Sequence, residues 1–586
     1  MNPSTILATV LVDELIRCGL REAVLAPGSR SAPLAMALDR RARAGDLRLC
    51  VRIDERSAAF TALGLAKASG VPVAVLCTSG TAAAHFHAAV IEADESAVPL
   101  LVLTADRPPE LRGTGANQTI DQLKLYGSAV RWFCEVGVPE AGAGLAGYWR
   151  SAASRAWGIA SGAAGGPPGP VHLNLPLREP LVPDVGGAEG PGGPGTSGAS
   201  GASGDSAAVG DAAAAGGGGR PGGSPWTRFA PVADVEPAER GLVVLGDGDY
   251  DAAPLLDLAA DAGWPVLAEP SSGGRSGPLA LSAYQYLLAD AGFMAGHRPE
   301  LIVSAGRPGL SRGQLALLRC GVAVRHVVLA AGPGRWSDPA RTATDVAAAV
   351  RLSGRATAGT GWLESWQRAD RATRDAVDAV LDAEPELSEP RLARDVAAAM
   401  PGGGLLWVAS SLPVRDLDQH MAPRAGLRVL ASRGASGIDG LVSSAIGAAL
   451  ARQAAGGGPA VALLGDLALV HDAPGLFVGP GEPRPDLCLI AVNNDGGGIF
   501  SMLEQAAFPE SFERVFGTPH GADVAALAAA AGLPYRRIER PADLAAALAA
   551  PRAGLRIAEL RTSRPEQAAL RARLTAAAAA ALSDLA

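Results

Sequence analysis

An aspartate and a pair of asparagines in the last third of the chain carry the clearest chemical signal. Asp466 follows the apolar run "AVALLG", and Asn493 and Asn494 end the run "LCLIAVNN". Asp466 and Asn494 lie 28 residues apart, about one strand–helix–strand crossover. Adjacent parallel strands end at one edge of a sheet, so both side chains are expected there. With the backbone carbonyl of Gly496, they would form a hard oxygen site that suits Mg²⁺ and a phosphate group.

The same residues also have a purely structural interpretation, because Asn, Asp and Gly dominate turns. Each motif is therefore weak by itself, whereas the two together in this order and spacing are more specific. A similar sequence, Gly246–Asp247–Gly248, follows the apolar run "GLVVL" but has no asparagine one crossover downstream. We assign it no metal.

Glu55 is the second candidate for chemistry. It follows the apolar run "RLCVRI" and precedes the small-residue run "SAAFTALGLAKASG", at the end of one predicted strand and the start of a predicted helix. A carboxylate at a helix start can simply stabilise the helix dipole. It can also act in proton transfer if burial raises its pKa.

Alternating short apolar runs and amphipathic stretches are the elements that must position these side chains. This alternation is typical of parallel sheets with helices on both faces. It occurs in three parts of the chain, so we predict an α/β protein of three doubly wound parallel-sheet domains. The predicted strands lie in "EAVLAPG", "RLCVRID", "PVAVLCTSG", "PLLVLTADRPP" and "PVHLNLP"; in "GLVVLGDGD", "WPVLAEP", "ELIVSAG" and "RHVVLAAG"; and in "GLLWVASS", "LRVLASRG", "AVALLGD", "LCLIAVNND" and "LRIAELRT".

Composition sets the boundaries between these domains. Residues 186–225 are almost entirely Gly, Ala, Ser, Pro and Thr, and such a segment buries too little apolar surface to fold. We predict an N-terminal domain (1–185), a flexible Gly/Ala-rich linker (186–225), a central domain (226–350), a connecting helical segment (351–389) and a C-terminal domain (390–586).

Charge and cysteine content exclude several classes of function. The chain has 586 residues, is 48% hydrophobic and has a net charge of −8, with no basic block for nucleic acid or an anionic membrane. Six scattered cysteines without CxxC spacing argue against zinc and disulfides, and fit the reducing cytoplasm. No signal peptide and no apolar run long enough to span a bilayer is evident.

The Asp466–Asn494 pair resembles the thiamine diphosphate (ThDP) motif of the ThDP-dependent decarboxylase superfamily. The resemblance implies that Asp466, Asn494 and the carbonyl of Gly496 hold Mg²⁺, for which Mn²⁺ can substitute, against the diphosphate. The motif usually reads Gly-Asp-Gly, whereas here Leu467 follows Gly465 and Asp466. This departure keeps the metal ligand.

The same resemblance gives Glu55 a role. In that superfamily a glutamate of the N-terminal domain meets N1′ of the cofactor's aminopyrimidine and helps to remove the C2 proton. Its place at a strand end in the first α/β domain makes Glu55 the matching residue.

Eight stretches in both outer domains are similar to one family, the 2-succinyl-5-enolpyruvyl-6-hydroxy-3-cyclohexene-1-carboxylate synthases of menaquinone biosynthesis. These transferases join 2-oxoglutarate to isochorismate with loss of CO₂. The stretches are "APGSRSAPLA" (26–35), "DERSAAF" (54–60), "TSGTAAA" (78–84), "LTADRPPELR" (103–112), "GANQTIDQ" (115–122), "SSLPVRDLD" (410–418), "SRGASGIDG" (432–440) and "NNDGGGIFSML" (493–503).

Both substrates of that family are dicarboxylates, which guanidinium groups bind with two parallel hydrogen bonds. The resemblance implies a set of substrate residues on each side of the cofactor. Isochorismate would be bound by Ser29, Arg30 and Arg107, with amide hydrogen bonds from Asn117 and Gln118 near the reacting centre. The succinyl part of 2-oxoglutarate would be held by Ser411, Arg415 and Arg433.

Two apolar residues and one further arginine complete the set that the resemblance implies. Ile438 would wedge beneath the cofactor and impose its bent shape, and Phe500 would pack against the pyrimidine or substrate. The family usually supplies a lysine from its middle domain; the nearest match here is "GRPGLSRGQL" (306–315), which places Arg312 in that role. A homodimer or homotetramer with active sites between subunits is also implied.

Purely structural roles for these residues stay open at this point. Ser29 and Arg30 could cap a helix, Arg107 could belong to a surface turn, and Ile438 could be a core residue. Two other functions are alternatives. One is another ThDP-dependent 2-oxo acid decarboxylase, such as an acetolactate synthase-like enzyme. The other is a non-catalytic nucleotide-binding protein, which would need none of Glu55, Asp466 and Asn494 together.

Overall fold

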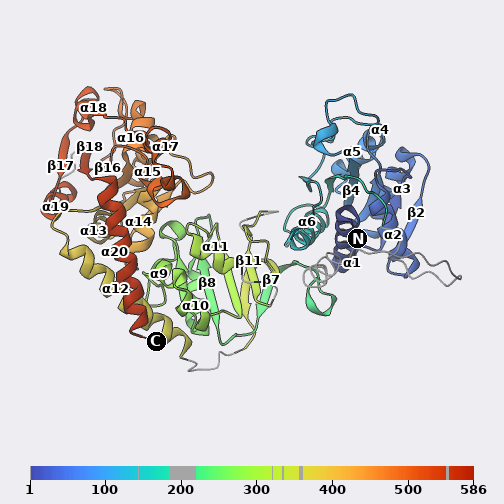
Figure 1. Ribbon diagram of the computed structural model, residues 1–586, viewed down its shortest axis with the longest axis horizontal. Helices are drawn as coiled ribbons and strands as arrows, with labels where there is room; N and C mark the ends of the chain where they lie inside the picture. The colour runs from blue at the N-terminus through green and yellow to red at the C-terminus, as the bar shows by residue number, and fades with distance from the viewer. Residues whose placement is uncertain are drawn as a thin grey trace, which may run out of the picture. The chain divides into compact units, whose positions relative to one another are not determined.

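A computed structural model describes residues 2–140, 142, 144–183, 219–319, 321, 323–330, 332, 335–354, 361–549 and 554–585 (Figure 1). The predicted linker, 186–225, lies outside the described residues as far as residue 218. The chain forms two compact units: residues 1–233 with 325–350, and residues 234–324 with 351–586. We describe each unit by itself.

The first unit contains a six-stranded sheet in the order β2-β1-β3-β4-β6-β5, in which all neighbours are parallel. This sheet carries every strand that the sequence predicted for the first domain. Its strands are β1 (Glu22–Leu25), β2 (Arg48–Val51), β3 (Val73–Cys77), β4 (Leu100–Asp106), β5 (Trp132–Glu135) and β6 (Pro170–Pro176).

Helices cover both faces of this sheet, because alternate residues of each buried strand point to opposite sides. In β3, Leu76 faces one core and Val75 faces the other. The first core is closed by α1 (Pro3–Cys18), α2 (Ala32–Arg43) and α6 (Leu145–Ala160). The second is closed by α3 (Glu55–Ser69), α4 (Thr81–Ala84) and α5 (His87–Glu95).

The C-terminal sheet of the second unit repeats this plan in the order β14-β13-β15-β16-β18-β17, again fully parallel. Its strands are β13 (Leu405–Val408), β14 (Arg428–Ala431), β15 (Ala460–Gly465), β16 (Leu487–Asn493), β17 (Tyr535–Ile538) and β18 (Leu555–Arg561). One face packs on α13 (Glu389–Ala399), α14 (Leu412–His420) and α19 (Pro541–Ala549). The other packs on α15 (Leu441–Ala454), α16 (Asp466–His471) and α18 (Val524–Ala530).

A third six-stranded sheet has the order β7-β12-β11-β10-β8-β9. Its strands are β7 (Arg228–Val235), β8 (Gly241–Leu245), β9 (Val266–Ala268), β10 (Leu301–Ala305), β11 (Arg325–Leu329) and β12 (Asp345–Leu352). Its helices are α8 (Ala253–Ala262), α9 (Tyr284–Ala289), α10 (Ala291–Gly296) and α11 (Arg312–Leu318). Three doubly wound sheets were predicted from the sequence, and this prediction is confirmed.

Two long helices of the second unit lie side by side: α12 (Trp362–Ala383), inside the predicted connecting segment, and α20 (Arg564–Ser583) (Figure 1). Their contact includes Val377 and Leu381 of α12 with Leu570 and Leu574 of α20. The end of the chain is therefore anchored along the second unit. The shorter helices are α17 (Pro509–Phe512), η1 (Pro109–Leu111), η2 (Pro221–Gly223), η3 (Pro270–Ser272), η4 (Ala473–Leu476), η5 (Gly498–Met502), η6 (Glu504–Ala507) and η7 (Glu513–Gly517).

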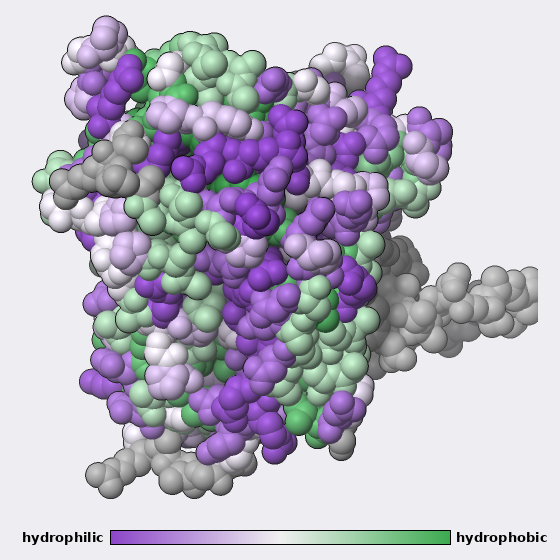
Figure 2. All heavy atoms as spheres, turned by 90° about the vertical axis from the view of Figure 1, so that its left-hand side faces the viewer, coloured by the Kyte–Doolittle hydropathy of each residue, from purple (hydrophilic) through white to green (hydrophobic). Residues whose placement is uncertain are grey.

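The surface in Figure 2 mixes hydrophilic and hydrophobic side chains, as is usual for a face in contact with water. Among the helices in the described part of the chain, none combines the length and the apolar character that a bilayer span requires.

Candidate active site

The register of two neighbouring strands brings the predicted metal ligands together. β15 and β16 run parallel with Gly465 opposite Val492, so both strands end at the same height. Asp466 begins α16 directly after β15, and Asn494 follows the last residue of β16. The predicted crossover geometry is thus present in the fold.

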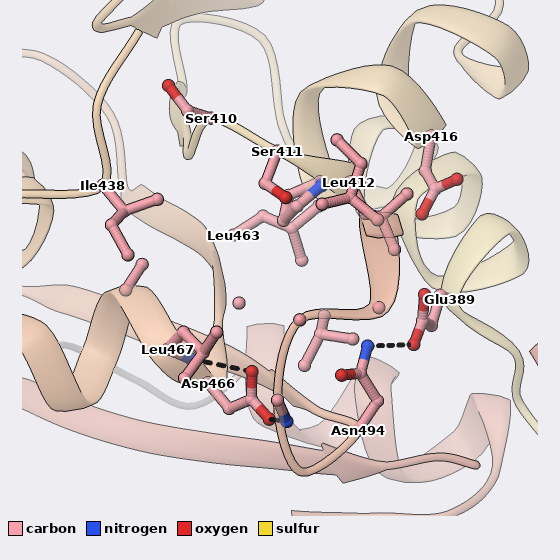
Figure 3. A pocket seen from close by; sticks show the side chains of 18 of the residues that line it. Glu389, Ser410, Ser411, Leu412, Asp416, Ile438, Leu463, Asp466, Leu467 and Asn494 are labelled. Atoms are coloured by element: carbon pink, nitrogen blue, oxygen red, sulfur yellow. Dashed lines mark hydrogen bonds between the residues drawn. The ribbon is translucent and has the colours of Figure 1, made fainter. Parts of the chain in front are cut away.

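Asp466 is buried, with 2% of its surface exposed, and its carboxylate is held from three directions. Oδ1 accepts the N–H of Leu467 at 2.7 Å, and Oδ2 accepts the N–H of Gly496 at 2.8 Å (Figure 3). His520 places Nε2 3.2 Å from Oδ2, while its Nδ1 accepts the N–H of Ala522. Burial raises the pKa of Asp466, and these hydrogen bonds oppose the rise.

Asn494 is oriented by a buried glutamate. Its Nδ2 donates to Oε1 of Glu389 at 2.8 Å (Figure 3). Its Oδ1 is buried and has no hydrogen-bond partner among the described residues. A buried oxygen without a hydrogen bond destabilises the fold, and binding a cation would remove this penalty at Asn494 Oδ1.

The loop after Asn494 requires glycine for steric reasons. Gly496 has φ of +134°, and a Cβ there would lie 1.9 Å from the carbonyl oxygen of Gly517. A Cβ at Gly497 would come within 2.4 Å of the carbonyl oxygen of Phe516. Only glycine, which has no Cβ, fits at positions 496 and 497 in this loop.

A cavity of about 160 Å³ opens at these strand ends (Figure 3). Gly465, Asp466, Asn494 and Gly496 line it, and so do several apolar side chains. The predicted cofactor residues Ile438, Leu467 and Phe500 are among the lining residues. Ile438 also packs against the core of this sheet, so its core interpretation and its place in the cavity wall are compatible.

The donor set of this cavity fits a hard divalent cation with a phosphate group. A carboxylate, an orphaned amide oxygen and a glycine backbone carbonyl are oxygen ligands of the type that Mg²⁺ prefers. The described residues contain no cluster of three or more His, Cys, Asp and Glu that could hold a metal by themselves. The cation would therefore need ligand oxygens from water or a bound phosphate.

Ser411 and Arg415 stand beside this cavity. Ser411 lines it and has φ of +74°, an uncommon backbone conformation for a residue with a side chain. Arg415 Nη1 donates to the carbonyl oxygen of Ser411 at 2.7 Å. Burial, and next the positive charge of Arg433, lowers the pKa of Arg415. Two guanidinium groups near one another favour a bound carboxylate.

The stretch 306–315 contains the predicted Arg312 and a second arginine, Arg307. The predicted Arg312 is well exposed, and its guanidinium lies 3.6 Å from Glu504. Arg307, in the same stretch, donates from Nη1 to the carbonyl oxygen of Gly434 at 3.0 Å, next to Arg433. Sequence reasoning did not single out Arg307, because one arginine among many gives no local signal.

The isochorismate side of the predicted site belongs to the first unit. Arg30 is buried. Its backbone N–H donates to Thr78 Oγ1 at 3.2 Å, and its side-chain Nη1 donates to the carbonyl oxygen of Leu177 at 2.9 Å. Burial, and next the charge of Arg107, lowers the pKa of Arg30. Ser29 is exposed beside it, and Ser31 occupies the cap position of α2, so Ser29 and Arg30 do not cap that helix.

Arg107 and Gln118 are fixed by backbone contacts within the same unit. Arg107 Nε donates to the carbonyl oxygen of Asn117 at 3.2 Å. Gln118 has φ of +55° and exchanges two hydrogen bonds with Ser79. Gln118 Nε2 donates to the carbonyl oxygen of Ser79, and Ser79 Oγ donates to the carbonyl oxygen of Gln118. Ser29, Arg30, Arg107, Asn117 and Gln118, five of the residues predicted for isochorismate, thus lie in the first unit, whereas the predicted Arg312 lies in the second.

Glu55 is the first residue of α3, four positions after the end of β2. The helix begins here because Asp54 caps it, accepting the N–H of Ser57 at 2.9 Å. Glu55 is therefore free of the capping role and partly exposed.

Two residues of the C-terminal site were missed in the sequence. Glu389 lies 105 residues before its partner Asn494, and His520 lies 54 residues after Asp466. Neither belongs to a recognisable spacing. The only available signal was that the chain contains few histidines, with one of them in a Gly-rich turn.

Comparisons with known proteins define the class of this site. Residues 6–125 match the family model of the N-terminal TPP binding domain of thiamine pyrophosphate enzymes, and residues 414–556 match that of the C-terminal TPP binding domain. The two matched domains therefore define the chain as a thiamine pyrophosphate enzyme.

The particular family follows from full-length relatives, each named 2-succinyl-5-enolpyruvyl-6-hydroxy-3-cyclohexene-1-carboxylate synthase. The protein from Thermobifida fusca is 58% identical, over 99% of this chain and 100% of its own length. Those from Saccharopolyspora erythraea and Kineococcus radiotolerans are 46% and 47% identical, each over 99% of this chain and 100% of its own length. The chain belongs to this family of synthases.

Proposed function

We propose that this protein joins 2-oxoglutarate to isochorismate with release of CO₂, a carboligation in menaquinone biosynthesis. The observation that carries the proposal is the cavity where Asp466 and the unpaired Oδ1 of Asn494 meet, with Ser411 on its wall and Arg415 on Ser411. Both substrates are dicarboxylates, so a site for them needs positively charged side chains such as Arg415 beside the cavity.

ThDP, when bound, supplies a carbon nucleophile for the ketone and accepts the electrons that CO₂ leaves behind. Asp466, Asn494 Oδ1 and the carbonyl oxygen of Gly496 would hold Mg²⁺, or Mn²⁺ in its place, against the diphosphate. Ile438, Leu467 and Phe500 would exclude water from the reacting centre.

Glu55 has the role of proton carrier in this proposal. Its carboxyl group would hydrogen-bond N1′ of the aminopyrimidine and share the proton there. Gln118 would orient the second substrate through its amide, which the contact with Ser79 already holds in place.

The arginines divide between the two substrates. Arg415 and Arg433, with Ser411, would bind the succinyl carboxylate of 2-oxoglutarate. Arg30 and Arg107, with Ser29, Asn117 and Arg312, would bind isochorismate. Burial, and next the neighbouring arginine, lowers the pKa of Arg30 and of Arg415, so a bound carboxylate relieves the repulsion within each pair.

The active sites of this proposal form between subunits of a homodimer or homotetramer, and the enzyme works in the cytoplasm. This part of the proposal rests on the resemblance to the ThDP superfamily; the predicted ligands fall in both family-model matches, Glu55 in the N-terminal one and Asp466 and Asn494 in the C-terminal one.

The direct test is CO₂ release from 2-oxoglutarate by the purified protein with ThDP and Mg²⁺, with and without isochorismate. We expect CO₂ release to be coupled to isochorismate consumption. Turnover of pyruvate without use of 2-oxoglutarate would instead indicate an acetolactate synthase-like enzyme.

Glu55→Gln tests the proton carrier. We expect carboligation to fall by roughly 10²–10⁴-fold, because an amide cannot share the N1′ proton. ThDP binding, measured by fluorescence titration, should stay within a few-fold of wild type. Near-normal turnover in this variant would refute the role of Glu55.

A further inference from the structure

Glu389 is a buried carboxylate in the wall of the cofactor cavity. It is the first residue of α13, and only 3% of its surface is exposed. Its Oε1 accepts Asn494 Nδ2 at 2.8 Å and Thr562 Oγ1 at 2.8 Å. No part of the predicted chemistry uses this group.

Arg571 balances the charge of Glu389 from the C-terminal helix α20. Its Nη2 donates to Glu389 Oε2 at 2.9 Å and to Asp416 Oδ2 at 2.8 Å. Both carboxylates line the cavity. The arginine and Thr562 therefore keep Glu389 in one position, with an oxygen directed at Asn494.

The geometry has a consequence for Asn494, because an amide presents an N–H group at one end and an oxygen at the other. A carboxylate accepts hydrogen bonds and cannot donate them. Glu389 therefore selects the orientation with Nδ2 toward itself, which leaves Oδ1 without a partner on the cavity side. The opposite orientation would set two oxygens against each other.

We propose that Glu389, held by Arg571, is a positioning residue that orients the Asn494 amide for cation binding and so sets the affinity of the cofactor site for its divalent ion. This inference rests on the proposed role of Asn494 as a cation ligand. Outer residues of this kind typically change metal affinity by about 10–100-fold.

The test is Mn²⁺ affinity of the full-length protein at saturating ThDP, measured from the electron paramagnetic resonance signal of free Mn²⁺. We expect Glu389→Gln to raise the Mn²⁺ dissociation constant roughly 10–100-fold. Glu384→Gln is the matched control, since Glu384 also pairs with α20, at Arg573, 2.8 Å away and outside the cavity lining. It should change the constant less than about twofold.

A second background separates orientation from simple structural support. Aspartate at position 494 has two equivalent oxygens and needs no orienting partner, while it repels the carboxylate of Glu389. In Asn494→Asp, we therefore expect Glu389→Gln to improve Mn²⁺ binding, the reverse of its effect beside asparagine. An equal loss in both backgrounds would overturn the inference.

The remaining outcomes distinguish this inference from the proposed function. If wild type binds Mn²⁺ with ThDP and Glu389→Gln does not change the affinity, the positioning role is wrong and the function stands. If wild type binds no Mn²⁺ in the presence of ThDP, the cation site of the proposed function fails, and the positioning role fails with it.

Discussion

Single carboxylates at strand ends hold neighbouring loops in this protein, and Glu269 is a buried example. It follows β9 and has 1% of its surface exposed. One of its oxygens accepts the N–H groups of Gly309 and Leu310, each at 2.8 Å. Burial, and next the charge of Asp418, raises the pKa of Glu269 to about 8.

This pKa predicts a pH dependence of stability. Between about pH 5 and pH 8 the unfolded chain loses the Glu269 proton while the folded chain keeps it, so stability falls as pH rises. The loss is on the order of a few kcal/mol over this window. Glu269→Gln cannot titrate and should show a smaller fall.

Urea unfolding of both proteins at pH 5 and pH 8 measures the difference. Glu300→Gln is the control, since Glu300 is exposed and its partner is the surface residue Arg240. It should keep the wild-type pH dependence. The same slope in Glu269→Gln and wild type would contradict the prediction.

At the scale of elements, the loop that follows β16 can form only with glycine at position 496. Its shape depends on Gly496, whose positive φ and contact with Gly517 leave no room for a side chain. The loop is pinned from outside by Arg564, which donates to the carbonyl oxygens of Asp495 and Gly517. A displaced loop would move Gly496, whose carbonyl oxygen is a proposed cation ligand.

Gly496→Ala should therefore weaken ThDP binding at least tenfold and destabilise the loop by roughly 1–3 kcal/mol. Gly447→Ala is the control: Gly447 lies in α15 with nothing within 4 Å of a new Cβ. It should leave binding unchanged and add up to about 1 kcal/mol of stability. Thermal melting of both variants measures the change in stability, and ThDP titration measures the change in affinity.

At the scale of the whole molecule, a buried ion pair joins distant parts of the first unit. Glu14 of α1 accepts Arg150 Nη1 at 2.8 Å and Ser154 Oγ at 2.9 Å, both from α6. Glu14 also accepts the backbone N–H of Trp226. The chain beyond residue 218 is thus tied to the first helix.

Glu14→Ala removes a buried carboxylate that pairs with the buried Arg150, so we expect a loss of about 3–5 kcal/mol. Asp39→Ala breaks the exposed pair with Arg43 and should cost less than about 1 kcal/mol. Equal melting temperatures for the two variants would show that the buried pair does not stabilise the unit.

Sequence reasoning identified three of the six edge strands, β2, β9 and β14, and every central strand except β12. β5, β7 and β17 lie at sheet edges and β12 beside one, and none was predicted. β17 reads "YRRI" and has two exposed residues, and β7 contains Pro231. An edge strand has one neighbour and one open side, so it needs no continuous apolar run.

The sequence by itself determined the parallel sheets and the pairing of Asp466 with Asn494. Both are encoded within one crossover, where apolar runs fix the strands and the spacing fixes the strand ends. Only the tertiary structure decided that Glu389 orients Asn494 and that Arg571 balances Glu389, over separations of 105 and 182 residues. Contacts at such separations depend on how helices pack on sheets, and no local periodicity records them.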